Sequence, residues 1–283
     1  MIPIYHGLSP LAGRYDAFIV DLWGVVHDGV RAFPEAVDCL ARLHRRGTRI
    51  LILSNAPRRA AEVAARSAAI GLPPHLCDFT VSSGEETWRD LVEHRAGARC
   101  YHLGPARDLG MRDGLAYAFV DDMAAADFIL NTGALAAEDT AEIYDPLLRP
   151  AAARGVPMVC ANPDLEVIRG NKREICAGAI AARYEAMGGA VRYHGKPHPG
   201  IYRTCFALLA GIPGPRIAAI GDSLRTDIAG AAAAGIDALF VTGGLQGAEL
   251  GVDPGGNADP ARLAALCAAA GVRPTAALPA LRW

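Results

Sequence analysis

Short apolar runs alternate along the chain with longer segments in which apolar residues recur every three or four positions. Runs of strand length occur at 18–21, 49–55, 79–83, 216–222 and 238–242. Between the first two runs, a helical pattern begins near Pro34 and stops at Gly47. The apolar face of this helix is formed by Val37, Leu40 and Leu43. Continuously apolar strands that alternate with helices predict an α/β fold, in which helices cover both faces of a parallel sheet.

The middle of the chain, 84–188, has a strand and helix rhythm of its own. Its strand candidates are 98–104, 116–120, 127–131 and 157–162. A helical pattern covers 138–154. These elements are sufficient for a second α/β unit with its own core. We expect this unit to be inserted into a first domain formed by 1–83 and 189–283, because the polar motifs described below fall on either side of it.

The last part of the chain is rich in turn-forming residues. It runs from Gly243 through GVDPGGNADP and leads to a final helical pattern at 262–270. We expect this stretch to be peripheral and the tail that ends at Trp283 to be loose.

The composition limits the classes of function that the chain can serve. It has 283 residues, a formal net charge of −2 and scattered basic residues, so nothing predicts binding to a nucleic acid polymer or a membrane surface. The apolar stretches are too short to span a bilayer, and the N-terminus does not resemble a secretory signal. The seven cysteines are dispersed, which predicts reduced, mostly buried thiols and a cytoplasmic location. Lysine occurs only at 172 and 196, so each lysine requires an explanation.

Polar side chains stand where apolar runs end or where a helix is about to begin. In chain order they are Asp21, Ser54, Asn55, Lys196 in the loop GKPHP, and Asp222. Ligands of an open parallel sheet bind beyond the carboxyl ends of its strands. We therefore expect these side chains to form one site for an anion and a metal ion.

The residue types suggest phosphoryl chemistry at this site. Asp21 can attack phosphorus and form an aspartyl-phosphate. Mg²⁺ would offset the repulsion between the two negative groups, with Asp21 and Asp222 as ligands and Asp227 holding a metal-bound water or orienting Asp222. Lys196 would supply a compact positive charge to the nucleophile and the phosphoryl oxygens. Hydrogen bonds to the same oxygens would come from Ser54 and the backbone amides near Asn55.

In their order along the chain, these motifs resemble those of the haloacid dehalogenase-like (HAD) hydrolase superfamily. DLWGV matches its first motif, LSN its second, GKP its third and GDSLRTD its fourth. The long insertion between the second and third motifs is similar to the branch with a large α/β cap, which includes NagD-type nucleotide phosphatases, 4-nitrophenyl phosphatases and pyridoxal phosphatases. The resemblance implies a Rossmann-like core, an Mg²⁺ cofactor and a small phosphorylated metabolite as substrate. It leaves homo-oligomerisation open.

The sequence departs from this pattern at Trp23. Phosphatases of the superfamily usually carry a second Asp at this position, which protonates the leaving group and later activates water. An indole cannot transfer a proton at neutral pH, although the backbone carbonyl of Trp23 can still bind Mg²⁺. Metal binding is therefore expected to survive the substitution. The side chain of Trp23 is explained either as a packing residue at the base of the cleft or as a donor of its indole N–H to a phosphoryl oxygen.

Three hypotheses follow from Trp23. In the first, the chain is a phosphatase whose leaving group needs no acid, or whose proton comes from water, His27 or Asp28. In the second, it is a dehalogenase-type hydrolase, because halide leaves without a proton; the intact metal motif argues against this. In the third, it is a weakly active or inactive homologue that binds a phosphorylated ligand or a partner.

Selectivity is expected to lie in the inserted unit. The ANPD stretch at 161–164 resembles the Asn-Pro-Asp element of such caps. Asn162 and Asp164 are therefore candidate substrate-binding residues, and Arg58 is expected to reach the cleft from the core. An ordinary turn would also explain the same four residues.

Overall fold

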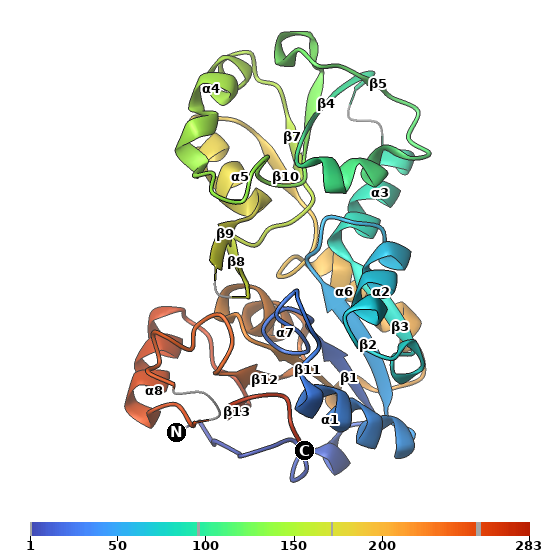
Figure 1. The fold of residues 1–283 in the computed structure, drawn as a ribbon, viewed down its shortest axis with the longest axis vertical. Helices are drawn as coiled ribbons and strands as arrows, with labels where there is room; N and C mark the ends of the chain where they lie inside the picture. Colours follow the sequence, from blue (N-terminus) through green and yellow to red (C-terminus); the bar gives the residue numbers. More distant parts are fainter. Residues whose placement is uncertain (1, 95–96, 171, 253–255) are drawn as a thin grey trace.

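The fold is described from a computed structural model that places residues 2–94, 97–170, 172–252 and 256–283. Two α/β units lie one above the other, with both chain termini in the lower unit (Figure 1). The lower unit, called the core below, is built from the two ends of the chain. The upper unit, called the cap, is built from the middle. The α/β fold class expected from the sequence is confirmed.

The core contains a six-stranded parallel sheet in the order β13-β12-β11-β1-β2-β3. Its strands are β1 (Ala17–Val20), β2 (Arg49–Ser54), β3 (Phe79–Ser82), β11 (Ile217–Gly221), β12 (Asp237–Val241) and β13 (Ala276–Leu278). Its helices are α1 (Pro34–Arg45), α2 (Ala60–Ala69), α6 (Pro199–Leu208), α7 (Ala229–Ala234) and α8 (Pro260–Ala269).

Both faces of this sheet are buried, which explains the uninterrupted apolar strands. In β1, Phe18 and Val20 belong to one hydrophobic cluster, while Ala17 and Ile19 belong to the cluster on the opposite face. Successive side chains of a strand point to opposite faces, so a strand covered on both sides must be apolar throughout.

The C-terminal tail is part of the core, so the expectation of a loose tail is wrong. β13 pairs in parallel with β12, and its three residues are buried. The guanidinium groups of Arg42 and Arg46 each lie 5.8 Å from the ring of Trp283. A run as short as Ala-Ala-Leu carries no periodicity of its own, so its strand conformation depends on the neighbouring strand.

The cap contains a five-stranded parallel sheet in the order β10-β7-β6-β4-β5. Its strands are β4 (Arg99–Leu103), β5 (Ala118–Phe119), β6 (Phe128–Asn131), β7 (Met158–Cys160) and β10 (Val191–Tyr193). Helices α3 (Ser83–Glu93), α4 (Asp145–Ala153) and α5 (Ala177–Ala186) accompany them. Because β10 pairs with β7, the sheet of the inserted unit extends beyond 188, where the sequence pattern placed its end.

An antiparallel hairpin that the sequence analysis did not predict projects from the cap toward the core (Figure 1). Its strands are β8 (Glu166–Arg169) and β9 (Lys172–Ile175). At its tip, the backbone amide of Gly170 donates a 3.1 Å hydrogen bond to the carbonyl of Asp28 in the core. The Gly-Asn pair between two β-type runs is a hairpin signal that could have revealed it.

All seven cysteines are free, and six of them are buried, as their dispersed positions suggested. In the described part of the chain, no helix has both the length and the apolar character needed to cross a membrane.

Candidate active site

The carboxyl ends of β1 and β11 meet at one edge of the core sheet and present three carboxylates there. Asp21 directly follows β1, and Asp222 directly follows β11. Asp227 lies in the single π-helical turn, Leu224–Ile228, that precedes α7. One carboxylate oxygen from each of the three residues lies within 4.8 Å of the others. The strand pairing of β1 with β11 therefore brings Asp21 and Asp222 together, although they are 201 positions apart in sequence.

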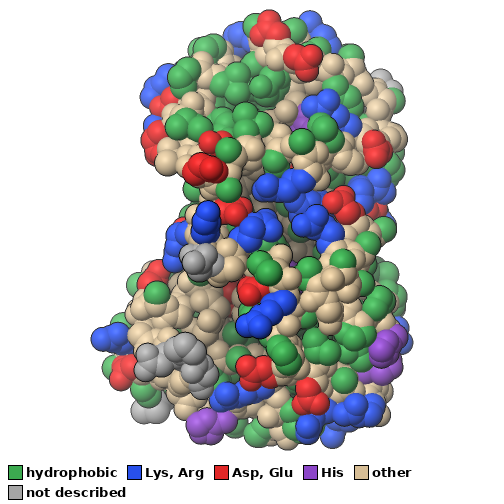
Figure 2. Space-filling model, in the orientation of Figure 1, with side chains coloured by type: hydrophobic (Ala, Val, Ile, Leu, Met, Phe, Trp, Pro, Cys, Tyr) green, Lys and Arg blue, Asp and Glu red, His purple; other side chains and the backbone are tan. Residues whose placement is uncertain are grey.

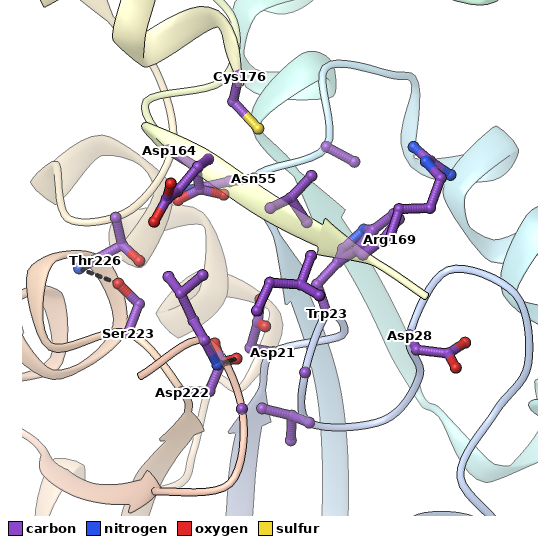
Figure 3. A pocket seen from close by; sticks show the side chains of 18 of the residues that line it. Asp21, Trp23, Asp28, Asn55, Asp164, Arg169, Cys176, Asp222, Ser223 and Thr226 are labelled. Atoms are coloured by element: carbon purple, nitrogen blue, oxygen red, sulfur yellow. Dashed lines mark hydrogen bonds between the residues drawn. The ribbon is translucent and has the colours of Figure 1, made fainter. Parts of the chain in front are cut away.

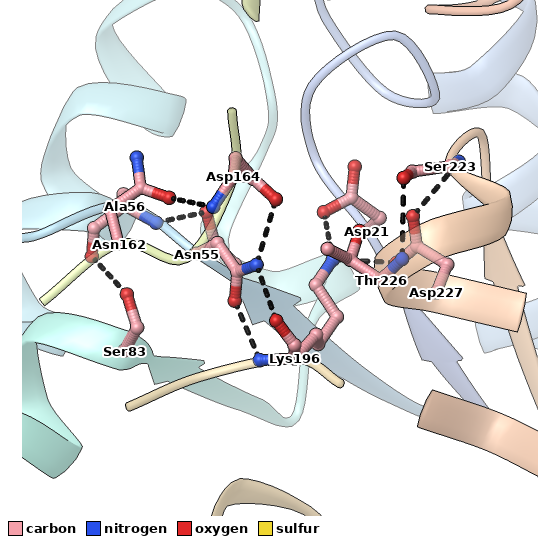
Figure 4. A network of polar contacts seen from close by, with 11 residues as sticks. Asp21, Asn55, Ala56, Ser83, Asn162, Asp164, Lys196, Ser223, Thr226 and Asp227 are labelled. Atoms are coloured by element: carbon pink, nitrogen blue, oxygen red, sulfur yellow. Dashed lines mark hydrogen bonds and ion pairs between the residues drawn. The ribbon is translucent and has the colours of Figure 1, made fainter. Parts of the chain in front are cut away.

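Lys196 links two of these carboxylates. Its Nζ lies 2.5 Å from Asp21 Oδ1 and 2.6 Å from Asp227 Oδ1 (Figure 4). The four side chains are almost completely buried, with Lys196 at 3% exposure and Asp21 and Asp222 at 7% each. One of the two lysines in the chain is thus explained as the counter-ion of the predicted nucleophile.

Two glycines allow the carboxylates to approach the backbone. A Cβ atom at Gly24 would lie 1.9 Å from Asp222 Oδ2, and one at Gly221 would lie 2.1 Å from Cγ of Asp227. Gly24 also has φ of +71°, a conformation that side-chain-bearing residues rarely adopt. The presence of glycine in DLWGV is therefore explained sterically, because only a residue without a side chain lets the loop after Asp21 pass against Asp222.

The buried cluster carries an excess of negative charge. Three carboxylates and one ammonium group leave a net charge of −2 when all are ionised. Burial together with the neighbouring carboxylates raises the pKa of Asp21 to about 7 and raises that of Asp222 well above its ordinary value. Burial alone would lower the pKa of Lys196, but Asp21 and Asp227 outweigh it and raise that pKa.

This arrangement fits a divalent cation. A divalent ion would neutralise the net charge of −2, and carboxylate oxygens are the ligands that Mg²⁺ prefers. Asp222 is additionally oriented by the backbone amide of Leu245, which donates a 2.7 Å hydrogen bond to its Oδ2. The carboxylate oxygens of the predicted ligands Asp21, Asp222 and Asp227 are therefore close enough together to share one ion.

The second motif contributes an amide clamp rather than an exposed hydroxyl. Asn55 Oδ1 accepts a 2.8 Å hydrogen bond from the backbone amide of Lys196, and Asn55 Nδ2 donates to the carbonyl of Lys196 at 3.0 Å. Ser54 is 1% exposed, and its Oγ accepts from the amide of Ala56 at 3.2 Å. Asn55 thus fixes the backbone of the lysine loop, while the hydroxyl of Ser54 supports the turn.

The cap supplies the opposite wall through the loop that follows β7. Asn55 Nδ2 also donates a 2.9 Å hydrogen bond to Asp164 Oδ1, which joins the cap to the core (Figure 4). Within the loop, Asn162 Oδ1 accepts from the backbone amide of Asp164 at 3.0 Å. Arg225 of the core donates to the carbonyl of Pro163. The ANPD stretch therefore lies where cap and core meet, with Asn162 closing a local turn onto Asp164, and the substrate-binding role expected for these two residues stays a prediction.

A cavity of about 490 Å³ lies between the two units. Its lining includes Asp21, Asp222 and Lys196 from the core and Asn162 and Asp164 from the cap. This volume suits a small organic molecule. On the face drawn in Figure 2, Lys and Arg side chains gather around the hollow between the units.

In the part of the chain that the structure describes, three arginines line this cavity. Arg58 pairs with Asp108 at 2.7 Å and is 7% exposed, so it reaches the cleft while bound to the cap. Arg107 and Arg169 come from the cap. Arg58 was predicted from the sequence to reach the cleft, whereas Arg169 was not, because it belongs to the unpredicted hairpin.

Trp23 occupies a place between the hairpin and the core. The guanidinium of Arg169 lies 4.9 Å from its ring centroid (Figure 3). The ring of His27 meets the indole edge-on, with 5.1 Å between the ring centroids. Arg169 is held in turn by Glu174, at 3.1 Å from its Nε. The indole is half-buried and lines the cavity. Trp23 therefore has a packing role and contacts the cap, in place of a proton-transfer group.

The two neighbours considered as substitute acids are engaged elsewhere. His27 Nδ1 accepts a 3.1 Å hydrogen bond from the amide of Gly29, and burial lowers the pKa of His27 to about 4. Asp28 Oδ1 accepts from the amides of Val30 and Arg31 at 2.9 Å each. Burial opposes these amides, but they outweigh it and lower the pKa of Asp28. Both side chains are thus unprotonated near neutral pH.

The site is therefore that of an α/β enzyme with a carboxylate cluster below a cap. Residues 18–115 match the family described as haloacid dehalogenase-like hydrolase, and residues 193–266 match one described as HAD-hydrolase-like. A haloacid dehalogenase-like hydrolase from Brucella suis 1330 has a structure with a TM-score of 0.86 and 35% identity, covering 98% of this chain and 99% of that one. The chain belongs to the haloacid dehalogenase-like hydrolases.

Further similarities locate the chain within that family. The ribonucleotide monophosphatase NagD of Escherichia coli is 25% identical over 237 residues, which is 81% of this chain and 88% of that protein. A p-nitrophenyl phosphatase from Archaeoglobus fulgidus has a structure with a TM-score of 0.70 at 21% identity, covering 94% of this chain and 96% of that one. The NagD-like branch with a large α/β cap, implied by the motifs, is confirmed.

Proposed function

We propose that this hydrolase is an Mg²⁺-dependent phosphomonoesterase that acts on small organic phosphates. The observation that carries the proposal is the bridge from Lys196 to Asp21 and Asp227, with Asp222 beside them on the floor of the cavity. A divalent metal ion neutralises the excess charge of three buried carboxylates and one ammonium group, and the ion and Lys196 then offer positive charge to a bound phosphate.

In the proposed reaction, Asp21 is the nucleophile. A carboxylate oxygen of Asp21 attacks phosphorus, the bond to the leaving oxygen breaks, and an aspartyl-phosphate forms. Lys196 balances the charge on the nucleophile and on a phosphoryl oxygen, and its loop is held by Asn55. Asp21, Asp222 and the backbone carbonyl of Trp23 would hold the ion. Asp227 would hold a metal-bound water or orient Asp222. Bound Mg²⁺ would supply the electrostatic offset between phosphate and carboxylate.

The proposed substrate is a small phosphorylated metabolite. The cavity volume supports this size class, and the arginines on its wall support an anionic ligand. The name of the similar NagD protein, a ribonucleotide monophosphatase, supports a phosphomonoester as the substrate class.

Trp23 favours one competing function, which is binding of a phosphorylated ligand without turnover. Loss of a general acid costs about 10²–10⁴ in rate, which slows an enzyme without abolishing its chemistry. Dehalogenation is less well supported, since a site for halide displacement does not need the two additional carboxylates Asp222 and Asp227.

The test is hydrolysis of p-nitrophenyl phosphate with and without Mg²⁺. The wild-type protein should release p-nitrophenolate only with Mg²⁺, and Asp21→Asn should reduce the rate to background. Lys172→Met is the matched control, because Lys172 is the other lysine and is exposed on the hairpin. Saturable Mg²⁺-dependent phosphate binding without any release of p-nitrophenolate would instead establish the binding protein.

A further inference from the structure

We propose that Asp164 is the general acid and base of this hydrolase, so that the proton-transfer group that Trp23 replaces is supplied by the cap. This inference rests on the proposed phosphatase function and deepens it. Beyond the substrate binding expected of Asp164, this side chain would transfer a proton to the leaving group and from the attacking water.

Asp164 is held in place from both units. Within the cap, its backbone amide is bound by Asn162 Oδ1 at 3.0 Å. From the core, Asn55 Nδ2 donates to Asp164 Oδ1 at 2.9 Å, and Arg225 donates to the preceding carbonyl of Pro163. The same Asn55 holds the lysine loop, so a single side chain relates the positions of Asp164 and Lys196.

One oxygen of Asp164 is available for chemistry. Among the described residues, no hydrogen bond or ion pair engages Oδ2 of Asp164, whereas its Oδ1 accepts from Asn55 Nδ2. Asp164 lines the cavity together with Asp21 and Trp23. Figure 3 shows Asp164 on the cap side of this space and Asp21 on the core side. A phosphate on Asp21 would carry its leaving group toward the cap wall, where Asp164 lies.

The surroundings of Asp164 favour a group that holds a proton more readily than an ordinary carboxylate. Burial is the largest influence and raises the pKa of Asp164; Lys196, the hydrogen bond from Asn55 and Arg225 oppose it, and Asp227 adds to it. The other ionisable groups facing it are Asp21, Cys160 and Cys176. The net direction is upward, opposite to that of Asp28 and His27, the two alternatives near Trp23.

In the forward step, the leaving oxygen receives a proton from Asp164. A carboxylate oxygen of Asp21 forms a bond to phosphorus while the ester P–O bond breaks, and its electron pair stays on the leaving oxygen. The carboxylic acid of Asp164 gives its proton to that oxygen. The products are the aspartyl-phosphate, the free alcohol and the Asp164 carboxylate.

The return step restores both residues. Water attacks phosphorus, the Asp164 carboxylate takes a proton from that water, and the bond between Asp21 and phosphorus breaks. Inorganic phosphate leaves, with Asp21 again ionised and Asp164 again protonated. Because Asp164 belongs to the cap, both proton transfers require the cap to be docked on Asn55.

The experiment compares two substrates of similar shape, p-nitrophenyl phosphate and benzyl phosphate. The first releases a phenolate that leaves without help, and the second releases an alkoxide that needs a proton. Asp164→Asn keeps an oxygen that can accept from Asn55, so the cap contact is retained. With Mg²⁺, this variant should lose about 10²–10⁴ in kcat on benzyl phosphate. On p-nitrophenyl phosphate, it should keep a fast burst of p-nitrophenolate followed by slow turnover, because aspartyl-phosphate accumulates.

Two further variants separate catalysis from cap docking. Asp28→Asn changes another carboxylate of the cavity wall and should leave the ratio of the two substrates unchanged. Trp23→Asp combined with Asp164→Asn should restore benzyl phosphate hydrolysis by at least tenfold over Asp164→Asn alone. In the wild type, kcat on benzyl phosphate should fall as pH rises through the pKa of Asp164, and this limb should disappear in Asp164→Asn.

Several results would overturn the assignment. If Asp164→Asn raises KM for both substrates and leaves their kcat ratio unchanged, Asp164 only docks the cap. If benzyl phosphate turnover is unaffected, another group is the acid. Either result leaves the proposed function intact, since wild-type turnover of p-nitrophenyl phosphate tests that function separately. Absence of wild-type turnover would refute both proposals.

Discussion

The floor and the roof of the cavity are built in different ways. The floor, formed by Asp21, Lys196, Asp222 and Asp227, lies at the ends of hydrogen-bonded strands and is almost completely buried. The roof consists of the Asn162–Asp164 loop and the hairpin β8–β9, whose strand residues are half-buried or exposed apart from the buried Glu174. The floor is positioned by the backbone of one sheet. The roof reaches its place only through side-chain and loop contacts with the core, such as Asn55 to Asp164 and Arg169 to Trp23.

This difference separates two properties of the site. Charge and metal chemistry belong to the floor, where burial makes every ionic contact strong. Proton transfer and selectivity belong to the roof, where the contacts are fewer and can be broken without unfolding the core. Changes in the floor should therefore alter both stability and activity, whereas changes in the roof should alter activity alone.

The largest effect is expected from Lys196→Met. This substitution leaves Asp21 and Asp227 buried without their counter-ion, and breaking a buried ion pair costs about 3–5 kcal/mol. Activity should fall to background, and the urea midpoint at pH 7.5 without metal should fall markedly. Lys172→Met should change neither value. An unchanged urea midpoint for Lys196→Met would mean that the ion pairs of Lys196 with Asp21 and Asp227 contribute little to stability.

The second prediction concerns metal binding to the floor. Mg²⁺ at 100 times its Kd should raise the free energy of unfolding of the wild-type protein by about 2.7 kcal/mol. Asp222→Asn has the same shape but one charge fewer, so it should lose most of this stabilisation in a thermal-shift titration. If Mg²⁺ or Ca²⁺ raised the melting temperature of the wild type and of Asp222→Asn by the same amount, this would argue against a metal site at these carboxylates.

A third, smaller effect is expected from pH in the metal-free protein. Since the pKa of Asp21 is about 7 in the folded state and about 4 in the unfolded chain, the folded state binds the extra proton. Its stabilising contribution is therefore present at low pH and lost as pH rises through 7. Between pH 8 and pH 6, the wild type should gain on the order of 1 kcal/mol relative to Asp21→Asn. Urea unfolding of both proteins at the two pH values measures this difference, and a gain in the opposite direction would contradict it.

The smallest effect is expected in the roof, from Arg169→Met. The cation–π contact with Trp23 is worth about 0.5–1 kcal/mol, so its loss should raise KM for p-nitrophenyl phosphate about two- to fivefold. The unfolding midpoint and the Mg²⁺ thermal shift should stay at their wild-type values, since the floor is untouched. A large loss of stability would show that the hairpin contributes to folding of the core.

The core sheet and its floor could be predicted largely from the sequence, for a physical reason. Strands buried on both faces are apolar throughout, and the carboxyl ends of parallel strands share one edge. A polar residue after each apolar run therefore had to lie near the others, as Asp21 and Asp222 do. The short strand β13 escaped this reasoning, because three small apolar residues become a strand only when β12 pairs with them.

The roof could be predicted only in part. The polar residues Asn162 and Asp164 were recognisable, but their contacts were not, because Asn55 lies 109 positions before Asp164. The hairpin carrying Arg169 was missed, although its turn signal is present. The sequence alone also showed that position 23 lacks a carboxylate. Only the tertiary structure showed that Trp23 packs against Arg169 and that Asp164 faces the same cavity. Contacts between the two units depend on how their surfaces meet, so they leave no local pattern in the sequence.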